Sequence, residues 1–232
     1  MALICHHYFS KYMSDKCTTI IFDLDGTLYK LRGGSYSQSP LKRYVLKNAA
    51  AYLAARLAKS KPEAARILRG ILKKYKEEIS IGVEKEFKLD RHDYFRTVWN
   101  IPARLVVSKE RNLRRSLLAL SKCYRLIIIS DAPLVWIKNV LIELGVYDIF
   151  RGRIFSGESD NRKGFQSAFP YIIKSLKLKP RDCISVGDQE SSDIIPAKKL
   201  GLKTVFINQL KKSTLADFNV KSIGELTELL LK

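Results

Sequence analysis

The chain has 232 residues, of which 46% are hydrophobic and 28% are charged, and its formal net charge is +19. This length allows one ordinary core with a sizeable insertion, or two small domains, and the composition excludes a disordered chain. No apolar run approaches the roughly 20 residues of a membrane-spanning helix, and residues 1–17 lack the apolar segment and cleavage site of a signal peptide. We therefore expect a cytoplasmic protein without a membrane partner.

The positive charge is concentrated in one third of the sequence. Residues 30–107 contain 18 basic and 7 acidic residues, which gives this segment a net charge of +11. Such a field attracts phosphorylated metabolites, nucleic acid or acidic membrane surfaces. Ordinary solvated helix faces account for the same charge, so the charge alone does not select a partner.

The cysteines and the N-terminal segment indicate no special chemistry. The cysteines lie far apart without a C-x-x-C pair, which argues against a disulfide framework or a structural zinc site. We expect residues 1–16 to be a poorly ordered leader, and translation can start at Met1 or Met13. The four cysteines are Cys5, Cys17, Cys123 and Cys183.

The first predicted strand, residues 18–22, leads directly into the sequence DLDGTLY at residues 23–29. This places Asp23 and Asp25 at the C-terminal end of a buried strand, where open parallel sheets bind their ligands, and Gly26 allows a sharp turn. Two neighbouring carboxylates repel each other, and a divalent cation relieves that repulsion. Mg²⁺ prefers hard oxygen ligands of this kind, so the spacing indicates phosphoryl-transfer chemistry.

Residues 39 to about 100 have the periodicity of helices rather than strands. Ser39 and Pro40 predict the start of a first helix, Ser60 with Glu63 predicts a capping box that begins a second, and Asp90 predicts the cap of a third. Apolar residues recur at helical spacing between Lys and Arg. We interpret them as the core of a helical insert.

From residue 108 onward predicted helices and strands alternate. Such alternation predicts right-handed crossovers and a parallel sheet with helices on both faces. Gly145 is expected just past the end of one helix, and Ser191 or Ser192 is expected to cap another. The strands are expected at residues 125–129, 153–155, 183–186 and 204–207, and the helices around 113–120, 133–144, 165–175, 191–200 and after Ser222.

Polar residues follow three of these strands, and we expect them to meet at one edge of the sheet. Each has an ordinary explanation when taken alone: Asp131 and Asp193 as helix N-caps, and Lys163 as a surface lysine. Their regular placement makes a shared site the better interpretation. The residues concerned are Asp23 and Asp25, Ser130 and Asp131, Asp188 and Asp193, together with Lys163 at the start of the intervening helix.

With these motifs in this order, the chain resembles the haloacid dehalogenase superfamily of phosphohydrolases over nearly its whole length after Cys17. Residues 23–29 are similar to the first motif of that family, Ser130 to the second, Lys163 to the third, and the segment from Asp188 to Asp193 to the fourth. The resemblance implies a Rossmann-like α/β core with an all-helical cap inserted after the first strand. The core would comprise residues 17–29 and 108–232, and the cap residues 30–107.

Three short segments of the sequence resemble the pyrimidine 5′-nucleotidase-like branch of that superfamily. Two positions depart from the usual pattern, because Gly164 follows Lys163 where proline is frequent and Asp131 follows Ser130 where asparagine is usual. Neither departure removes a catalytic group. The segments that carry the finer resemblance are 144–150, 197–201 and 92–94.

The resemblance implies that Asp23 attacks the substrate phosphorus and forms an aspartyl-phosphate. The anionic nucleophile then needs a Mg²⁺ ion, which the Asp23 carboxylate, the backbone carbonyl of Asp25 and Asp188 would hold. Asp193 would be a further metal-site acid, or would orient Lys163 or a bound water.

The remaining roles also come from the resemblance. Asp25 would protonate the leaving oxygen and then deprotonate the attacking water. Ser130, Asp131 and Lys163 would bind the phosphoryl oxygens. Thr27 would position Asp25 through a hydrogen bond.

The leading hypothesis is a Mg²⁺-dependent phosphatase of a small phosphate monoester, with a nucleoside 5′-monophosphate as the first choice of substrate. Sugar phosphates, phosphoglycolate and a phosphomutase reaction remain open, whereas dehalogenation would leave Asp25 and Asp188 without a purpose. A different class of function is polyanion or nucleic-acid binding on the basic insert, although no specific nucleic-acid motif supports it. The sequence leaves the oligomeric state open.

Overall fold

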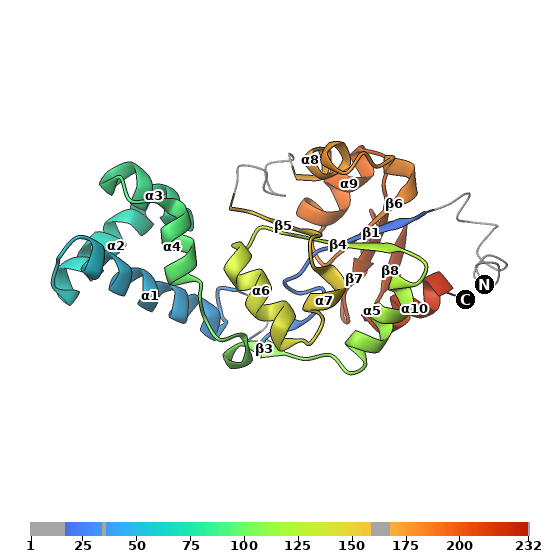
Figure 1. The fold of residues 1–232 in the computed structure, drawn as a ribbon, viewed down its shortest axis with the longest axis horizontal. Coiled ribbons are helices and arrows are strands. Elements are labelled where there is room, and N and C mark those ends of the chain that lie inside the picture. Colours follow the sequence, from blue (N-terminus) through green and yellow to red (C-terminus); the bar gives the residue numbers. More distant parts are fainter. Residues whose placement is uncertain (1–16, 34–35, 159–167, 232) are drawn as a thin grey trace.

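The computed structural model describes residues 17–33, 36–158 and 168–231. Its centre is a six-stranded sheet in the order β5-β4-β1-β6-β7-β8, in which every neighbouring pair is parallel. The first strand therefore lies in the middle of the sheet, between β4 and β6 (Figure 1). The strands are β1 Thr19–Phe22, β4 Arg125–Ser130, β5 Ile154–Ser156, β6 Cys183–Gly187, β7 Lys203–Ile207 and β8 Phe218–Val220.

Helices cover both faces of this sheet. Along β1 the side chains alternate, so that Ile20 and Phe22 belong to one hydrophobic cluster and Ile21 to the other. The first cluster packs under α5, α6, α7 and α10, and the second under α8 and α9 (Figure 1). The predicted doubly wound α/β core is confirmed. The helices are α5 Leu113–Ser121, α6 Leu134–Glu143, α7 Tyr147–Phe150, α8 Ala168–Ser175, α9 Ile195–Lys199 and α10 Ile223–Leu231.

The first four helices of the chain form a separate group beside the sheet, in blue and green at the left of Figure 1. The predicted caps are present: the Ser39 hydroxyl accepts the backbone N–H of Leu41 at 3.1 Å, and the Asp90 carboxylate accepts that of Asp93. The predicted capping box is also formed, since Glu63 accepts the backbone N–H of Ser60 at 2.9 Å. We call these four helices the helical group. They are α1 Pro40–Arg56, α2 Lys61–Tyr75, α3 Ile79–Phe87 and α4 Arg91–Val98.

One helix of this group, α3, is absent from the prediction. It has only nine residues, no side chain caps its start, and Gly82 interrupts its apolar pattern. Gly82 is required by packing, because a Cβ there would lie 2.6 Å from a methyl carbon of Ile71 and 2.7 Å from the ring of Tyr75 on α2. Gly82 thus weakens the helical pattern of α3 in the sequence and at the same time allows α3 to pack closely against α2.

Two short antiparallel strands join the helical group to the sheet. These strands are β2 (Lys30–Leu31) and β3 (Val107–Ser108), in which Lys30 lies opposite Ser108. Neither they nor β8 were predicted, and strands of two residues such as β2 and β3 show no periodicity. The pair falls at the predicted ends of the insert, residues 30 and 107.

The connection after β6 also differs from the prediction. A π-helical turn, Glu190–Ile194, precedes α9, and no side chain caps it, so the expected cap by Ser191 or Ser192 is wrong. Two 3₁₀ turns, Ala103–Leu105 and Pro180–Asp182, complete the described elements. Within the described residues, no helix is both long and apolar enough to cross a membrane.

Candidate active site

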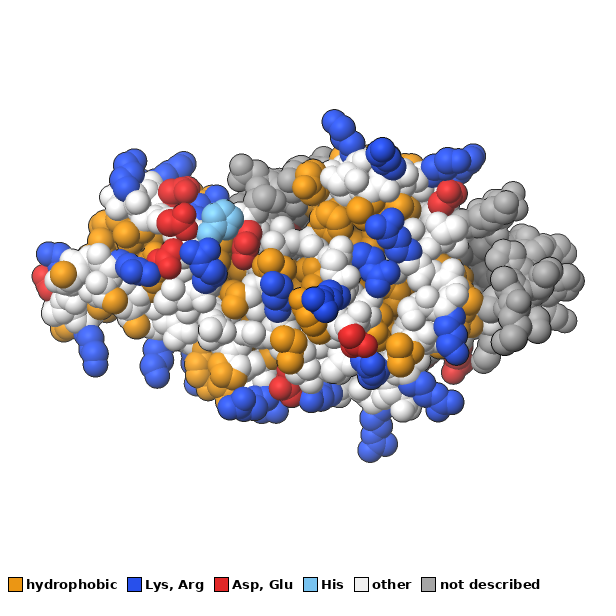
Figure 2. Space-filling view, in the orientation of Figure 1, with side chains coloured by type: hydrophobic (Ala, Val, Ile, Leu, Met, Phe, Trp, Pro, Cys, Tyr) orange, Lys and Arg blue, Asp and Glu red, His pale blue; other side chains and the backbone are white. Residues whose placement is uncertain are grey.

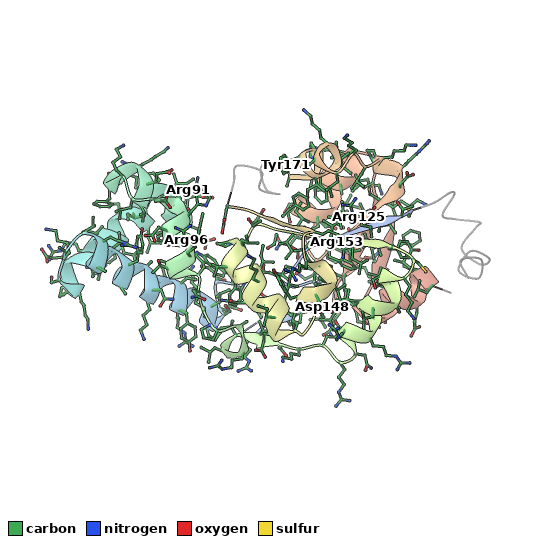
Figure 3. All side chains as sticks on the ribbon, viewed as in Figure 1. Arg91, Arg96, Arg125, Asp148, Arg153 and Tyr171 are labelled. Carbon is green, nitrogen blue, oxygen red and sulfur yellow. The ribbon has the colours of Figure 1, made fainter. Side chains whose placement is uncertain are left out.

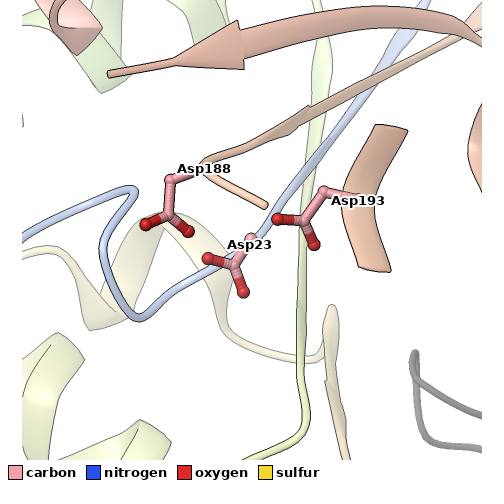
Figure 4. A group of neighbouring side chains, drawn as sticks. All are labelled: Asp23, Asp188 and Asp193. Atoms are coloured by element: carbon pink, nitrogen blue, oxygen red, sulfur yellow. The ribbon is translucent and has the colours of Figure 1, made fainter. Parts of the chain in front are cut away.

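Three carboxylates meet beyond the C-terminal ends of the central strands. Asp23 follows β1, and its backbone N–H donates to the carbonyl of Val186 at 2.9 Å, which continues the pairing with β6. Asp188 follows β6, and Asp193 lies on the π-helical turn. One carboxylate oxygen from each of the three lies within 4.8 Å of the others, and Figure 4 shows the carboxyl groups pointing into one shared space. The predicted convergence of these acids is therefore present.

Two glycines allow the acids to come this close. Gly26 has φ +97°, and a Cβ at that position would lie 2.2 Å from Oδ2 of Asp188. A Cβ on Gly187 would lie 2.3 Å from Cγ of Asp193. Because real side chains do not tolerate such distances, any other residue at either position would push an acid out of the cluster.

Asp193 is buried and held by hydrogen bonds. Its Oδ2 accepts the backbone N–H of Gln189 at 3.0 Å, and its Oδ1 accepts the hydroxyl of Ser192 at 3.3 Å. Its backbone carbonyl accepts the hydroxyl of Ser185 at 2.8 Å. Sequence reasoning missed Ser185, although a serine inside a buried strand is a usable signal because buried hydroxyls need partners.

Asp25 accepts hydrogen bonds from three side chains. Ser130 donates to Oδ2 at 3.2 Å, Trp136 donates its indole N–H to Oδ1 at 3.2 Å, and the Tyr29 hydroxyl donates to Oδ1. Burial and then the charge of Asp25 raise the pKa of Tyr29 well above its ordinary value, which keeps this hydroxyl a donor. The sequence analysis assigned no role to Tyr29, the last residue of the first motif, or to Trp136, which lies six positions after Ser130.

Thr27 supports a different acid from the one expected. Its hydroxyl donates to Oδ2 of Asp23 at 2.9 Å, so the predicted bond to Asp25 is wrong. The reason is the tight turn, in which the backbone N–H of Thr27 donates to the carbonyl of Leu24 and brings the hydroxyl back over the strand end. Thr27 therefore orients Asp23.

The remaining predicted residues, Asp131 and Lys163, lie outside the acid cluster or outside the described residues. Asp131 is exposed beside the cluster, and α6 is not capped by it, because Glu158 accepts the backbone N–H of Leu134 at 2.8 Å. Lys163 lies outside the described residues, and its role stays a prediction. A cation that was not predicted, the ammonium of Lys30, donates to the backbone carbonyl of Gly26.

A cavity of about 340 Å³ lies against Asp23 and Asp25. Its near end is polar and includes Ser130. Its far end reaches into the helical group and is lined mainly by aromatic and apolar side chains. The far-end residues are Leu31, Tyr36, Leu41, Glu77 and Trp99.

The sequence model of one protein family, described as haloacid dehalogenase-like hydrolase, matches residues 17–201. The chain belongs to this family. The family resemblance drawn from the motifs is thereby confirmed, while the nucleotidase branch stays a prediction.

Two curated proteins and one solved structure illustrate how this haloacid dehalogenase-like hydrolase relates to others. A glyceraldehyde 3-phosphate phosphatase of Methanocaldococcus jannaschii is 31% identical over 107 residues, which cover 44% of this chain and 47% of that protein. The human N-acylneuraminate-9-phosphatase is 28% identical over 149 residues, 62% of this chain and 59% of that protein. The chain thus matches about half the length of these curated relatives.

The similarity to solved structures covers nearly the whole chain. A phosphatase of the same superfamily from Thermococcus onnurineus aligns with a TM-score of 0.62 at 24% identity, covering 92% of this chain and 97% of that one. Similarity at this level establishes the shared fold.

The acid cluster of this family member has the donor set of a divalent-cation site. Asp23, Asp188 and Asp193 offer carboxylate oxygens, the ligands that Mg²⁺ prefers, and they are arranged close enough to share one ion. Three carboxylates in this space repel one another, and a bound dication would offset that repulsion. These three residues therefore fit a Mg²⁺ ion.

Proposed function

We propose that this protein is a Mg²⁺-dependent phosphomonoesterase that acts on a small phosphorylated metabolite through an aspartyl-phosphate. One observation carries the proposal: Asp23, Asp188 and Asp193 lie together at the strand ends, with Asp25 and an open cavity beside them. Such a site has both a nucleophile and the means to neutralise the charge of a phosphate ester.

Asp23 is the nucleophile in this proposal. The hydroxyl of Thr27 donates to its Oδ2, which fixes the rotation of the carboxyl group so that a carboxylate oxygen is oriented to attack phosphorus. A bond forms between this oxygen and phosphorus while the bond from phosphorus to the leaving oxygen breaks. When bound by Asp23, Asp188 and Asp193, Mg²⁺ supplies charge neutralisation between the anionic nucleophile and the anionic ester.

Asp25 is the proton donor and acceptor. It gives a proton to the departing oxygen and later takes one from the water that hydrolyses the aspartyl-phosphate. Tyr29 and Trp136 hold Oδ1 from one side. The hydrogen bond from Ser130 to Oδ2 is the contact that substrate binding would exchange, because Ser130 lies at the end of the cavity where the phosphate would bind.

Ser130 binds a phosphoryl oxygen in this account. Its Oγ accepts the backbone N–H of Ala132 at 3.1 Å, which leaves the hydroxyl hydrogen to donate either to Asp25 or to the phosphoryl group. We assign Lys163 and Asp131 to the same end of the substrate, Lys163 on the motif order alone.

The helical group is the cap in this proposal and contacts the leaving group, because the cavity extends from the acids to Tyr36 and Trp99. We take residues 30–107 as this cap and residues 17–29 and 108–232 as the core. A nucleoside 5′-monophosphate remains the first choice of substrate. The relatives are named as phosphatases of phosphorylated small molecules. These names support this class of substrate but do not select one compound within it.

Polyanion binding gains no support from the face of the molecule that Figure 2 shows. On the face that Figure 2 shows, the blue Lys and Arg side chains of the described residues are spread over both the helical group and the sheet region. They are interspersed with acids and do not gather in one patch. A nucleic-acid site needs a continuous basic stripe, so the phosphatase proposal is the better one.

The proposal is tested with a panel of phosphate monoesters, with Mg²⁺ and after treatment with EDTA. We expect phosphate release that depends on Mg²⁺, and incorporation of ¹⁸O from labelled water into the released phosphate. Undiminished turnover in EDTA would contradict the metal assignment. Transfer of the phosphoryl group to a second hydroxyl of the substrate, without labelled phosphate, would indicate a phosphomutase instead.

A further inference from the structure

A second cavity, of about 260 Å³, lies beside the turn that follows β1, where Thr27 and Tyr29 line it. Among the described residues, its lining shares none with the active-site cavity. We propose that this second cavity binds a phosphate dianion, and that the bound ion holds the connecting strands β2 and β3 against the core. Neither claim depends on the proposed reaction.

Two parts of the molecule meet at the second cavity. Lys30 and Ser108 lie opposite each other in the β2–β3 pair, and Lys109 follows β3. Gln209 follows β7 and Lys221 follows β8, so both belong to the edge of the six-stranded sheet. The cavity therefore lies between the strands that lead to the helical group and the core.

The lining of the second cavity carries a positive charge. Its described residues include three cations, Lys30, Lys109 and Lys221, and one acid, Glu110, which gives a net charge of +2. Glu110 is already occupied, because backbone N–H groups at the start of α10 donate to its carboxylate. A cavity with excess positive charge and a satisfied acid attracts a compact anion, and two positive charges match a dianion.

The lysines have hydrogens left to donate. Lys30 is half-buried, and its ammonium donates to the carbonyl of Gly26, which uses one of its three hydrogens. Lys109 pairs with Glu143 at 2.7 Å, but the Lys109 side chain is 58% exposed, so this pair is weak. Lys221 makes no ion pair within the described part of the chain. Phosphate oxygens are strong acceptors for these hydrogens.

Two neutral side chains add donors with a fixed direction. They are the hydroxyl of Ser108 and the amide of Gln209. The turn that carries Gln209 is held in place, because Oδ1 of Asn208 accepts the backbone N–H groups of Leu210 and Lys211, each at 3.0 Å. Charged and neutral donors thus surround the cavity from both of its sides, as a tetrahedral oxyanion requires.

A bound dianion couples the connecting strands to the core. It contacts Lys30 and Lys109 on one side and Lys221 on the other. A ligand stabilises the arrangement in which all of its contacts are made, so phosphate favours the state in which β2 and β3 lie against the sheet edge. The same cavity is lined by Thr27, whose hydroxyl orients Asp23, so the effect extends to the active site.

Binding is tested by calorimetric titration of the whole protein with inorganic phosphate in EDTA, at constant ionic strength. Without Mg²⁺ the carboxylates of the acid cluster repel phosphate, so the heat reports the second cavity. We expect one phosphate per protein. Lys221→Met should weaken binding roughly tenfold, as loss of a hydrogen bond to a charged group does. Gln209→Glu should also weaken it, because it adds a negative charge and removes no cation.

The control is Arg96→Met. Arg96 is an exposed cation on α4 that does not line the second cavity, and Figure 3 shows it within the helical group. This variant should bind phosphate as the wild type does, and circular dichroism checks that all variants are folded. Glycerol 3-phosphate is titrated in parallel. Equal affinity would show that the ion alone is the ligand, whereas tighter binding would assign the site to the phosphate group of a larger metabolite.

Hydrogen exchange followed by mass spectrometry tests the coupling. Phosphate, compared with chloride at the same ionic strength, should slow exchange in the peptides that contain residues 30–31 and 107–108, and Lys221→Met should abolish this difference. Absence of binding in EDTA, or equal affinity in the wild type, Lys221→Met and Gln209→Glu, would overturn the site. Binding that leaves the exchange of both strands unchanged would overturn the coupling.

Discussion

The two ends of the active-site cavity are built in different ways. At the near end, Asp23 and Asp188 continue directly from β1 and β6, so the hydrogen bonds of the sheet fix their backbones. At the far end, Tyr36 precedes the helical group and Trp99 follows it, and this group joins the sheet through the two-residue strands β2 and β3. The proposed chemistry is thus placed at the ends of the hydrogen-bonded sheet, and the leaving-group contacts next to a group of helices that the chain enters and leaves through two short strands.

This difference has a consequence for mutation. Changes at the near end should act on kcat, because they move groups that touch the reacting atoms. Changes at the far end should act on the choice of substrate and on the stability of the helical group. The following variants test whether the two ends separate in this way, from the largest expected effect to the smallest.

Asp23→Asn should have the largest effect. Loss of the nucleophile is expected to reduce kcat by about 10⁴-fold, as loss of a catalytic group does in well-studied hydrolases. Phosphate release under saturating substrate measures it, and circular dichroism checks the fold. Asp148→Asn, which alters an exposed acid paired with Arg114 at 2.7 Å, should leave kcat unchanged. Activity of wild-type magnitude in Asp23→Asn would refute the nucleophile assignment.

Gly26→Ala should disrupt the acid cluster through one added methyl group. That carbon would collide with Asp188, so we expect about a 10²-fold loss of activity and a higher Mg²⁺ concentration for half-maximal activity. Gly145→Ala is the control, because Gly145 also has positive φ, +71°, but nothing lies within 4 Å of its added Cβ. The control should lose only about 1 kcal/mol of stability. Equal Mg²⁺ dependence in the two variants would contradict the role of Gly26.

Tyr29→Phe should lower kcat by about tenfold with little change in KM, because it removes a donor to Asp25 while keeping the ring. Tyr52→Phe removes a similar bond, from Tyr52 to Asp93 at 3.0 Å, within the helical group. Steady-state kinetics on ribose 5-phosphate should show a loss of kcat only in Tyr29→Phe. A comparable loss in Tyr52→Phe would mean that the two ends are not separate.

Gly82→Ala and Gly70→Ala should have the smallest effects, and of opposite sign. Overpacking between α3 and α2 is expected to make Gly82→Ala about 1–3 kcal/mol less stable. Gly70, on α2, is exposed with nothing within 4 Å, so Gly70→Ala should gain about 0.5–1 kcal/mol from helix propensity. Denaturant unfolding measures both. A Gly82→Ala protein as stable as the wild type would show that the helices pack less closely than described.

The two ends also differ in how far the sequence predicts them. The residues of the near end follow apolar runs that predict buried strands, and parallel strands bring their ends to one edge, so the meeting of Asp23, Asp188 and Asp193 could be inferred. The hydrogen-bond partners of these acids could not be inferred from the sequence. Thr27 bonds Asp23 rather than Asp25 because of the local shape of the turn, which the residue types do not specify.

The far end was predicted only as helices. Their starts were correct where a serine or aspartate accepts a backbone N–H, as at Ser39 and Asp90. Tyr36 and Trp99 are 63 positions apart in the sequence, and their contact depends on how the helices pack, which periodicity does not encode. Helix α3 was not predicted for a similar reason, because Gly82 is required by the packing against α2 and interrupts the helical pattern of the sequence.

The most direct test of the central claim is to trap the covalent intermediate. Wild-type protein is mixed with Mg²⁺ and ribose 5-phosphate, quenched in acid within the first turnovers, digested, and searched by mass spectrometry for a phosphorylated carboxyl group. The account predicts phosphate on the peptide that contains Asp23, and its absence in Asp23→Asn. Phosphate on another residue, or complete turnover of substrate with no phosphorylated peptide, would contradict it.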